Sequence, residues 1–275
     1  MGTGRSPAVP SGPPPPDSMM RRLLLAALVL ALLPFAARAA APRIVVMIGE
    51  EEYHTWETLP EFAKADLEPL GYRVTLVVAD AADKNNFPGL VEALRDADLL
   101  FLSVRRRTPH TAQLDAVRTY LDSGRPLVGI RTACHAFIVL GDRPAGGKLE
   151  DWPEFGPEVI GSHYTRHYND APMTKVTVGP GAEGHPILRG VSAAALGGPT
   201  TLYAVIPLAE GAVPLLLTTT PGHPGEAVAW THAYGANRAR VFYTQLGAPN
   251  DFKNPDFRRL LVNGVAWALG RTGQP

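Results

Sequence analysis

The only cysteine of the chain, Cys134, stands directly before His135 in the stretch PLVGIRTACHAF, residues 126–137. A thiol beside an imidazole can act as a nucleophile with its base, because the thiolate is the reactive form and a base generates it. The alternative is a small buried residue, since free cysteine is among the most buried residue types. A single cysteine cannot form an internal disulfide, so the choice lies between these two roles.

Arginines gather near the cysteine and in one earlier run. The run is Arg105–Arg107, and Arg131 lies three residues before the cysteine. A guanidinium group forks two hydrogen bonds onto a carboxylate, a phosphate or vicinal oxygens, although a short charged run also fits a solvated loop. We expect Arg131 to be buried and paired with a carboxylate such as Glu50 or Glu51.

Histidines are the second polar feature, and four of them fall in the same segments. Histidine exchanges protons near neutral pH, and His135 and His167 are the preferred proton shuttles. His163 and His167 have the spacing of one helix face, which with a carboxylate such as Asp251 would suit zinc. Their stretch is rich in glycine and tyrosine and also fits a loop. No cofactor is therefore predicted, and zinc is kept as an alternative.

Aromatic side chains, notably Trp56 and Tyr164, offer flat apolar faces on which the C–H face of a sugar ring can stack. They could equally cover the open end of a sheet. The catalytic residues that we expect are Arg131, His135 and His167. The expected ligand contacts are His54, Glu51, Arg105, Arg107, Asp251, Trp56 and Tyr164.

Composition narrows the class of protein. The 275 residues include 26 basic and 26 acidic side chains, and 45% of all residues are hydrophobic. This is a globular composition, and a formal charge of zero gives no global attraction to nucleic acid or to anionic membranes. We expect a small-molecule partner and no nucleic acid, and the sequence is compatible with a homo-oligomer.

The front of the chain has the features of a processed leader. Residues 1–19 are rich in proline and glycine, and we expect them to be disordered or to precede the true start. Residues 20–39 combine two arginines, the apolar run Leu23–Leu33 and an A-x-A site ending at Ala39, which is typical of a signal peptide. A short membrane anchor is the alternative, but the run is short for a span. The mature protein should be secreted or periplasmic, without stable membrane association.

Apolar runs alternate with helical patterns over the first half of the remaining chain, which predicts right-handed βαβ units and a parallel sheet. An irregular segment over residues 141–172 and a partly antiparallel second half follow. The fold class is α/β, three-layered and flavodoxin-like, in one domain over residues 43–270. Strands are expected at 43–49, 72–78, 98–104, 126–130, 174–178, 201–206, 213–219, 226–231 and 240–246, and helices at 58–70, 87–95, 111–121 and 256–269.

Ligands of open parallel sheets bind outside the carboxyl ends of the strands. The segments that leave those ends are residues 49–56, 104–110, 131–137 and 246–252. Side chains capable of chemistry crowd into these four segments. The pattern therefore predicts one site at that edge of the sheet.

Several segments between residues 43 and 270 carry a family pattern. They include IGEEEYHTWETLPEFA, SVRRR, VGIRTACHAF, WPEFGPEVIGSHYTRHY, GHPIL and the ending FRRLLVNGVAWALG, and the most specific are RTACHAF and the stretch from RVFYTQLG to WALG. Through these segments the chain resembles the ThuA-like family, named for trehalose utilisation. The resemblance implies the fold of class I glutamine amidotransferases.

The resemblance also bears on Cys134. In class I glutamine amidotransferases the turn after the fourth strand reads G-x-C-x-G, with the cysteine as nucleophile. Laid onto residues 129–133, GIRTA, this pattern puts Arg131 at the nucleophile position, and arginine has no nucleophilic lone pair at neutral pH. ThuA-like sequences commonly show LGH after the last strand, where this chain has Ala248. Glutamine hydrolysis by that route is therefore not expected.

The resemblance implies a role in the catabolism of trehalose or related sugars, with no settled reaction. Our interpretation is an exported protein that acts on or binds a carbohydrate-type small molecule. Arg131 would polarise an oxygen, and His135 or His167 would shuttle the proton. Two alternatives stay open: a non-catalytic sugar-binding module, and a metal-dependent hydrolase using His163 and His167.

Overall fold

Five parallel strands form the first part of the sheet. In the computed structural model, β1 (Arg43–Gly49) lies between β2 (Arg73–Val78) and β3 (Leu99–Val104). Strands β4 (Leu127–Ile130) and β10 (Ala239–Thr244) continue the parallel pairing. The strands β1, β3, β4 and β10 are mostly buried apolar runs because both of their faces are covered, whereas the edge strand β2 is largely exposed. The structure describes residues 1, 2, 4, 12, 40–139, 141, 148–173, 175–219 and 222–271.

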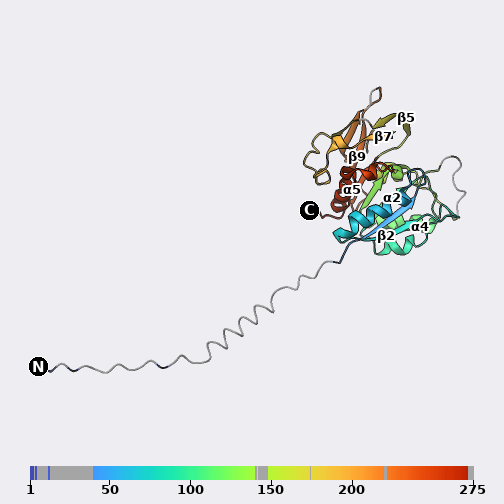
Figure 1. The fold of residues 1–275 in the computed structure, drawn as a ribbon. Helices are drawn as coiled ribbons and strands as arrows, with labels where there is room; N and C mark the ends of the chain where they lie inside the picture. The colour runs from blue at the N-terminus through green and yellow to red at the C-terminus, as the bar shows by residue number, and fades with distance from the viewer. Residues whose placement is uncertain are drawn as a thin grey trace. The chain divides into compact units, whose positions relative to one another are not determined.

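Three antiparallel strands complete the sheet: β9 (Glu226–Tyr234), β8 (Val213–Thr219) and β6 (Lys175–Val178). The order across the eight strands is β2-β1-β3-β4-β10-β9-β8-β6. The mostly parallel sheet with an antiparallel second part that the sequence predicts is therefore confirmed, and Figure 1 shows its helices packed around it.

Helices cover both faces of the sheet. On one face, α2 (Thr55–Phe62) continues through further helical turns to Leu70 and packs with α5 (Pro255–Ala268) against Ile44, Val46 and Phe101. On the other face, α3 (Leu90–Arg95) and α4 (Thr111–Asp122) pack against Val45, Met47 and Leu102. Alternate residues of each strand thus feed two separate apolar cores. The result is the three-layer arrangement expected from the sequence.

A second, two-stranded sheet of β5 (Arg166–Met173) and β7 (Gly198–Ala204) is anchored by two buried polar side chains. The Gln245 amide accepts a hydrogen bond from the Tyr203 N–H (2.8 Å) and donates to the Tyr203 carbonyl (3.2 Å). The Glu226 carboxylate accepts hydrogen bonds from the N–H groups of Val205 and Ile206. Gln245 directly follows the end of β10, and Glu226 is the first residue of β9.

The prediction of a long irregular loop over residues 141–172 is wrong in part. It contains a helical turn, Phe155–Ile160, and most of β5. The pattern missed both because the turn holds Gly156 and Pro157 and the strand holds Pro172, residues that usually mark loops. The remaining short helices are Arg131–His135, Pro186–Leu188, Ala193–Ala195 and Asp251–Lys253.

The predicted signal peptide, residues 20–39, lies outside the described residues. From Ala41 onward the described chain forms one compact unit. In the part of the chain that the structure describes, no helix combines the length and apolar character needed to cross a membrane.

Replacing Gly264 by alanine should destabilise the fold, because overpacking a core costs about 1–3 kcal/mol. A Cβ at this position in α5 would overlap the ring of Phe242, which is fully buried and cannot move aside. The gain in helix propensity of about 1 kcal/mol offsets part of this cost, which leaves a net destabilisation of up to about 2 kcal/mol. Chemical denaturation would measure the change. Gly184→Ala is the control, because a Cβ there meets no atom within 4 Å, and equal stability of the two variants would contradict the prediction.

Candidate functional site

The chain reverses its direction of winding between β1 and β3. β1 is followed by β2 on one side, and the chain then returns to place β3 on the other side. Ligands bind at such switch points, outside the carboxyl ends of the strands. The loops after β1, β3 and β4 therefore define the candidate site.

Backbone strain is concentrated in these same loops. Among the described residues, four non-glycine residues have a positive φ, and three of them are His54 (52°), Arg106 (50°) and Arg131 (46°). They follow β1, β3 and β4, in that order. A left-handed conformation costs a residue with a Cβ about 1 kcal/mol or more and is found preferentially at functional sites.

The loop after β1 is shaped by the buried carboxylate of Glu50. One of its oxygens accepts hydrogen bonds from the N–H (2.7 Å) and hydroxyl (2.6 Å) of Thr55, and the other accepts from the N–H of Tyr53 (2.6 Å). Glu50 thus caps the start of α2 from a distance and fixes the loop that carries Glu51, Tyr53 and His54. An acceptor at a helix N-terminus satisfies N–H groups that otherwise lack partners.

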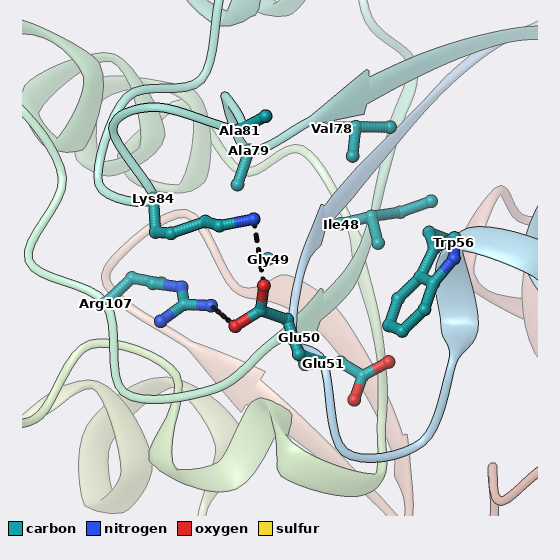
Figure 2. A pocket seen from close by; sticks show the side chains of 10 residues that line it. All are labelled: Ile48, Gly49, Glu50, Glu51, Trp56, Val78, Ala79, Ala81, Lys84 and Arg107. Atoms are coloured by element: carbon teal, nitrogen blue, oxygen red, sulfur yellow. Dashed lines mark hydrogen bonds and ion pairs between the residues drawn. The ribbon is translucent and has the colours of Figure 1, made fainter.

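A cavity of about 330 Å³ opens beside this loop, at the ends of β1 and β2. Figure 2 shows the side chains of Lys84 and Arg107 converging on one carboxylate, with Trp56 across the cavity from them. The acceptor is Glu51, whose oxygens lie 2.8 Å from Lys84 Nζ and 3.3 Å from Arg107. The hydrogen bond from Lys84 lowers the pKa of Glu51, so the carboxylate is ionised at neutral pH. The cavity is lined by Ile48, Gly49, Glu50, Glu51, Trp56, Val78, Ala79, Ala81, Lys84 and Arg107.

Trp56 is 37% exposed, although a large aromatic side chain is normally well covered. Its ring lies 4.7 Å from the ring of His54, measured between centroids. Three of the residues that the sequence predicted as ligand contacts line this one cavity: Glu51, Trp56 and Arg107. His54 lies against the tryptophan that lines it.

The arginine run joins this cavity to the loop after β4. The side chain of Arg107 lines the cavity, and Arg105 pairs with Glu52 (2.7 Å) in the loop after β1. The N–H of Arg106 donates to the carbonyl of His135 (3.2 Å), and the N–H of Arg107 donates to that of Ala136 (2.8 Å). The arginine run therefore contacts both the cavity beside Trp56 and the loop that carries His135.

Arg131 occupies the sharp turn between β4 and the helical turn Arg131–His135. It is fully buried, and its guanidinium donates to the Gln245 carbonyl, the Tyr53 hydroxyl and the Thr201 hydroxyl, each at 3.0 Å. The expected partnership with Glu50 or Glu51 is wrong. The Glu50 carboxylate accepts hydrogen bonds from Tyr53 and Thr55 in the loop after β1, and Glu51 binds Lys84 and Arg107.

The Arg131 guanidinium also stacks between two tyrosines. It lies 4.6 Å from the ring centroid of Tyr53 and 4.1 Å from that of Tyr203. The two hydroxyls are themselves 3.3 Å apart. Cation–π contacts and neutral acceptors, with no direct carboxylate in the part of the chain that the structure describes, offset the buried charge.

Cys134 turns into the protein rather than over the sheet. It is buried, with its Sγ 3.2 Å from Nδ1 of His135, and burial raises the pKa of the thiol to about 12. The thiol is therefore protonated at neutral pH and is no ready nucleophile. Of the two roles open to this cysteine, the geometry favours the small buried residue.

His135, Tyr164 and His167 form a polar aromatic cluster. The rings of His135 and Tyr164 stack with centroids 4.1 Å apart, and the Tyr164 hydroxyl lies 3.4 Å from Nδ1 of His167. Burial, followed by the charges of Arg106 and Arg105, lowers the pKa of His135 to about 2, so its imidazole is neutral. His167 is exposed. The structure thus brings together the two histidines that the sequence singled out.

Two expected arrangements are not found. His163 and His167 do not share a helix face, because β5 begins at Arg166 and the residues just before it are not helical. Within the described ranges, no three His, Cys, Asp or Glu side chains gather as a metal site would require. Asp251, one of the expected ligand contacts, accepts hydrogen bonds through Oδ2 from the N–H groups of Gly247 (2.8 Å) and Ala248 (2.9 Å). It closes the turn after β10.

The comparisons with known proteins agree with this fold. The family model for ThuA, described as trehalose utilisation, matches residues 43–268, and the chain belongs to that family. The fold is similar to that of a ThuA-like protein from Parabacteroides merdae ATCC 43184, with a TM-score of 0.58 and 18% identity over 86% of this chain and 92% of that one. It is also similar to the mmIFT52 N-terminal domain, with a TM-score of 0.48 and 13% identity over 82% and 96%. No curated protein matches this chain.

Sequence reasoning missed several residues of the site. Three of them, Tyr53, Tyr203 and Gln245, are uncharged, and Lys84 stands in a stretch to which no element was assigned. Two had a signal, since Arg106 belongs to the arginine run and Tyr53 to the segment of residues 49–56. The missed residues are Tyr53, Lys84, Arg106, Tyr203 and Gln245.

Stability should fall as the pH decreases below about 6.5, partly because of His135. Its pKa is about 2 in the folded protein and about 6.5 in the unfolded chain, so between these values the unfolded state binds the extra proton. The full contribution is present above pH 6.5, and below it the loss approaches about 1.4 kcal/mol per pH unit. Denaturation from pH 7 to pH 4 should show a shallower slope for His135→Gln. The exposed His163→Gln is the control, and parallel curves for wild type and His135→Gln would contradict this assignment.

Proposed function

We propose that this protein binds a carbohydrate-type small molecule at the carboxyl edge of its sheet and acts on it by proton transfer, as part of sugar catabolism. The observation that carries the proposal is the cavity in which Trp56 lies across from Glu51, Lys84 and Arg107. Membership of a family described as trehalose utilisation supports the same ligand class.

The composition of the cavity suits the two surfaces of a sugar. The C–H face of a pyranose packs on an aromatic ring, and its hydroxyl groups bind charged and forked side chains. Trp56 supplies the ring, and the ionised triad of Glu51, Lys84 and Arg107 supplies donors and an acceptor. The volume of about 330 Å³ lies at the lower end of the range of about 300–1,000 Å³ for small-molecule pockets.

Proton transfer is assigned to the cluster on the far side of the arginine run. His167 does not line the cavity, but it is exposed and lies against the Tyr164 hydroxyl. It can therefore exchange protons with solvent and with a part of the ligand that extends past the arginine run. His135 is buried beneath Tyr164 and orients that ring. In this proposal Arg131 holds Tyr53 and Tyr203 in place from below. No cofactor is part of the proposal.

A panel of trehalose, other disaccharides and oxidised sugars should include a ligand that raises the melting temperature of the wild-type protein. Trp56→Ala should weaken binding of that ligand about tenfold, because the loss of one stacked ring is worth about 1.4 kcal/mol. Glu51→Gln should weaken it similarly by releasing Lys84 and Arg107. His167→Ala should keep binding but lose product formation, followed by chromatography.

The controls are Arg43→Ala, which removes an ion pair with Asp96 at the other end of β1, and Cys134→Ser. Both should bind the ligand as the wild type does. Binding unchanged in Trp56→Ala and Glu51→Gln would remove the ligand from this cavity.

The same experiment distinguishes the proposed enzyme from a second candidate, a non-catalytic sugar-binding module. The observation that favours it is the absence of both amidotransferase groups from their positions, which Arg131 and Ala248 occupy. A module would bind a member of the panel and form no product with any of them. The proton-transfer half of the proposal fails in that case, while the binding half stands.

We also propose that residues 20–39 direct export to the periplasm or out of the cell. The support is their sequence alone: two arginines, an apolar run and an A-x-A site. Expression in a bacterial host should give a periplasmic protein whose intact mass corresponds to a first residue at Ala40. Replacing Ala37 and Ala39 by large residues should block this cleavage, and a cytoplasmic product that retains the whole leader in the wild type would contradict export.

A further inference from the structure

The outer edge of β2 presents unpaired backbone groups. Among the described residues this strand pairs only with β1, and the N–H groups of Arg73 and Ala79 donate to carbonyls on the β1 side. Successive residues of a strand direct their backbone groups to opposite sides. The N–H and C=O groups of Val74, Leu76 and Val78 therefore face away from the sheet.

The two edges of the sheet differ in how they are protected. β6, the opposite edge, has four residues and begins with Lys175, and short charged strands resist pairing with another chain. β2 has six residues without proline, and on it Leu76 is 40% and Val78 is 45% exposed. Its edge is therefore the one suited to receive a further strand.

We propose that two copies of this chain pair through their β2 strands in antiparallel orientation and form a two-fold symmetric dimer. The register centred on Leu76 sets Leu76 beside its own copy and Val74 beside Val78, so that all outward backbone groups are matched. The exposed apolar side chains of the two strands then lie together on one face of a continuous sheet.

Charge complementarity argues for a second copy as the occupant of this edge. β2 begins with Arg73 and is followed at its other end by Asp80. In this register Arg73 of each copy lies opposite Ala79 of the other, one residue from Asp80, whose Oδ1 also accepts hydrogen bonds from the N–H groups of Ala82 and Asp83. Parallel pairing would instead set like charges side by side, at a cost in stability.

The dimer would also reach the cavity beside Trp56. Val78 lines that cavity, and the proposed register places Val74 of the other copy next to it. Each copy would thereby extend the apolar rim of the site in its neighbour. The dimer itself does not depend on the proposed sugar ligand.

The test is the mass of the full chain in solution, measured by light scattering during size-exclusion chromatography. Wild type should have twice the mass of one chain. Leu76→Lys should raise the dissociation constant tenfold or more, since two like charges across a strand pair cost about 1.4 kcal/mol or above. Val178→Lys on β6 is the matched control, with a similar exposure of 37%, and should remain a dimer.

A mixing experiment tests the register and guards against loss of folding. Leu76→Asp should also be monomeric alone, but mixed with Leu76→Lys it should form a heterodimer, because position 76 faces itself across the two-fold axis. Circular dichroism confirms that each variant is folded. A monomeric wild type, a dimer untouched by Leu76→Lys, or the absence of a heterodimer in the mixture would overturn the proposal.

Discussion

The buried positive charge of Arg131 is the constraint around which the site is built. A guanidinium without solvent needs hydrogen-bond partners, because an unsatisfied buried charge costs several kcal/mol. Both terminal nitrogens of Arg131 have partners, whereas its buried Nε has none among the described residues. The partners of Arg131 come from three distant segments: Tyr53 after β1, Thr201 on β7 and the Gln245 carbonyl after β10. Folding can bury this arginine only when all three segments are in place, so the charge couples the large sheet to the small one.

Gln245 extends that coupling. Its carbonyl accepts from Arg131, and its side chain binds both backbone groups of Tyr203. The ring of Tyr203 in turn covers the guanidinium and lies edge-on to Tyr164, with centroids 5.0 Å apart. A chain of contacts therefore runs from the buried charge to the exposed face of the site. Side chains locked in this way lose little freedom when a ligand binds, which favours affinity.

The sequence predicted the parallel part of the fold well, because buried strands alternate there with amphipathic helices and the patterns are local. The resemblance to the amidotransferase pattern G-x-C-x-G also placed Arg131 at the turn, because residues 129–133 match that pattern locally. The partners of Arg131 were not predictable in this way. Thr201 and Gln245 are neutral, lie 70 and 114 residues away, and carry no pattern that marks them as ligands of a charge. β5 was missed for a different reason, since its proline breaks the alternation by which strands are recognised.

An arginine at this turn changes what the fold can do. A small nucleophile there would sit above the sheet, within reach of a substrate. The long Arg131 side chain is instead buried under Tyr53 and Tyr203, and the thiol of Cys134 is buried and protonated. Neither Arg131 nor the protonated Cys134 is a ready nucleophile at this turn. Arg131 instead packs between the rings of Tyr53 and Tyr203. A ligand of the proposed site would therefore meet its outer groups, the Glu51 triad and the His167–Tyr164 pair. In the proposed function these groups would hydrogen-bond hydroxyl groups and transfer protons, without a covalent bond to the protein.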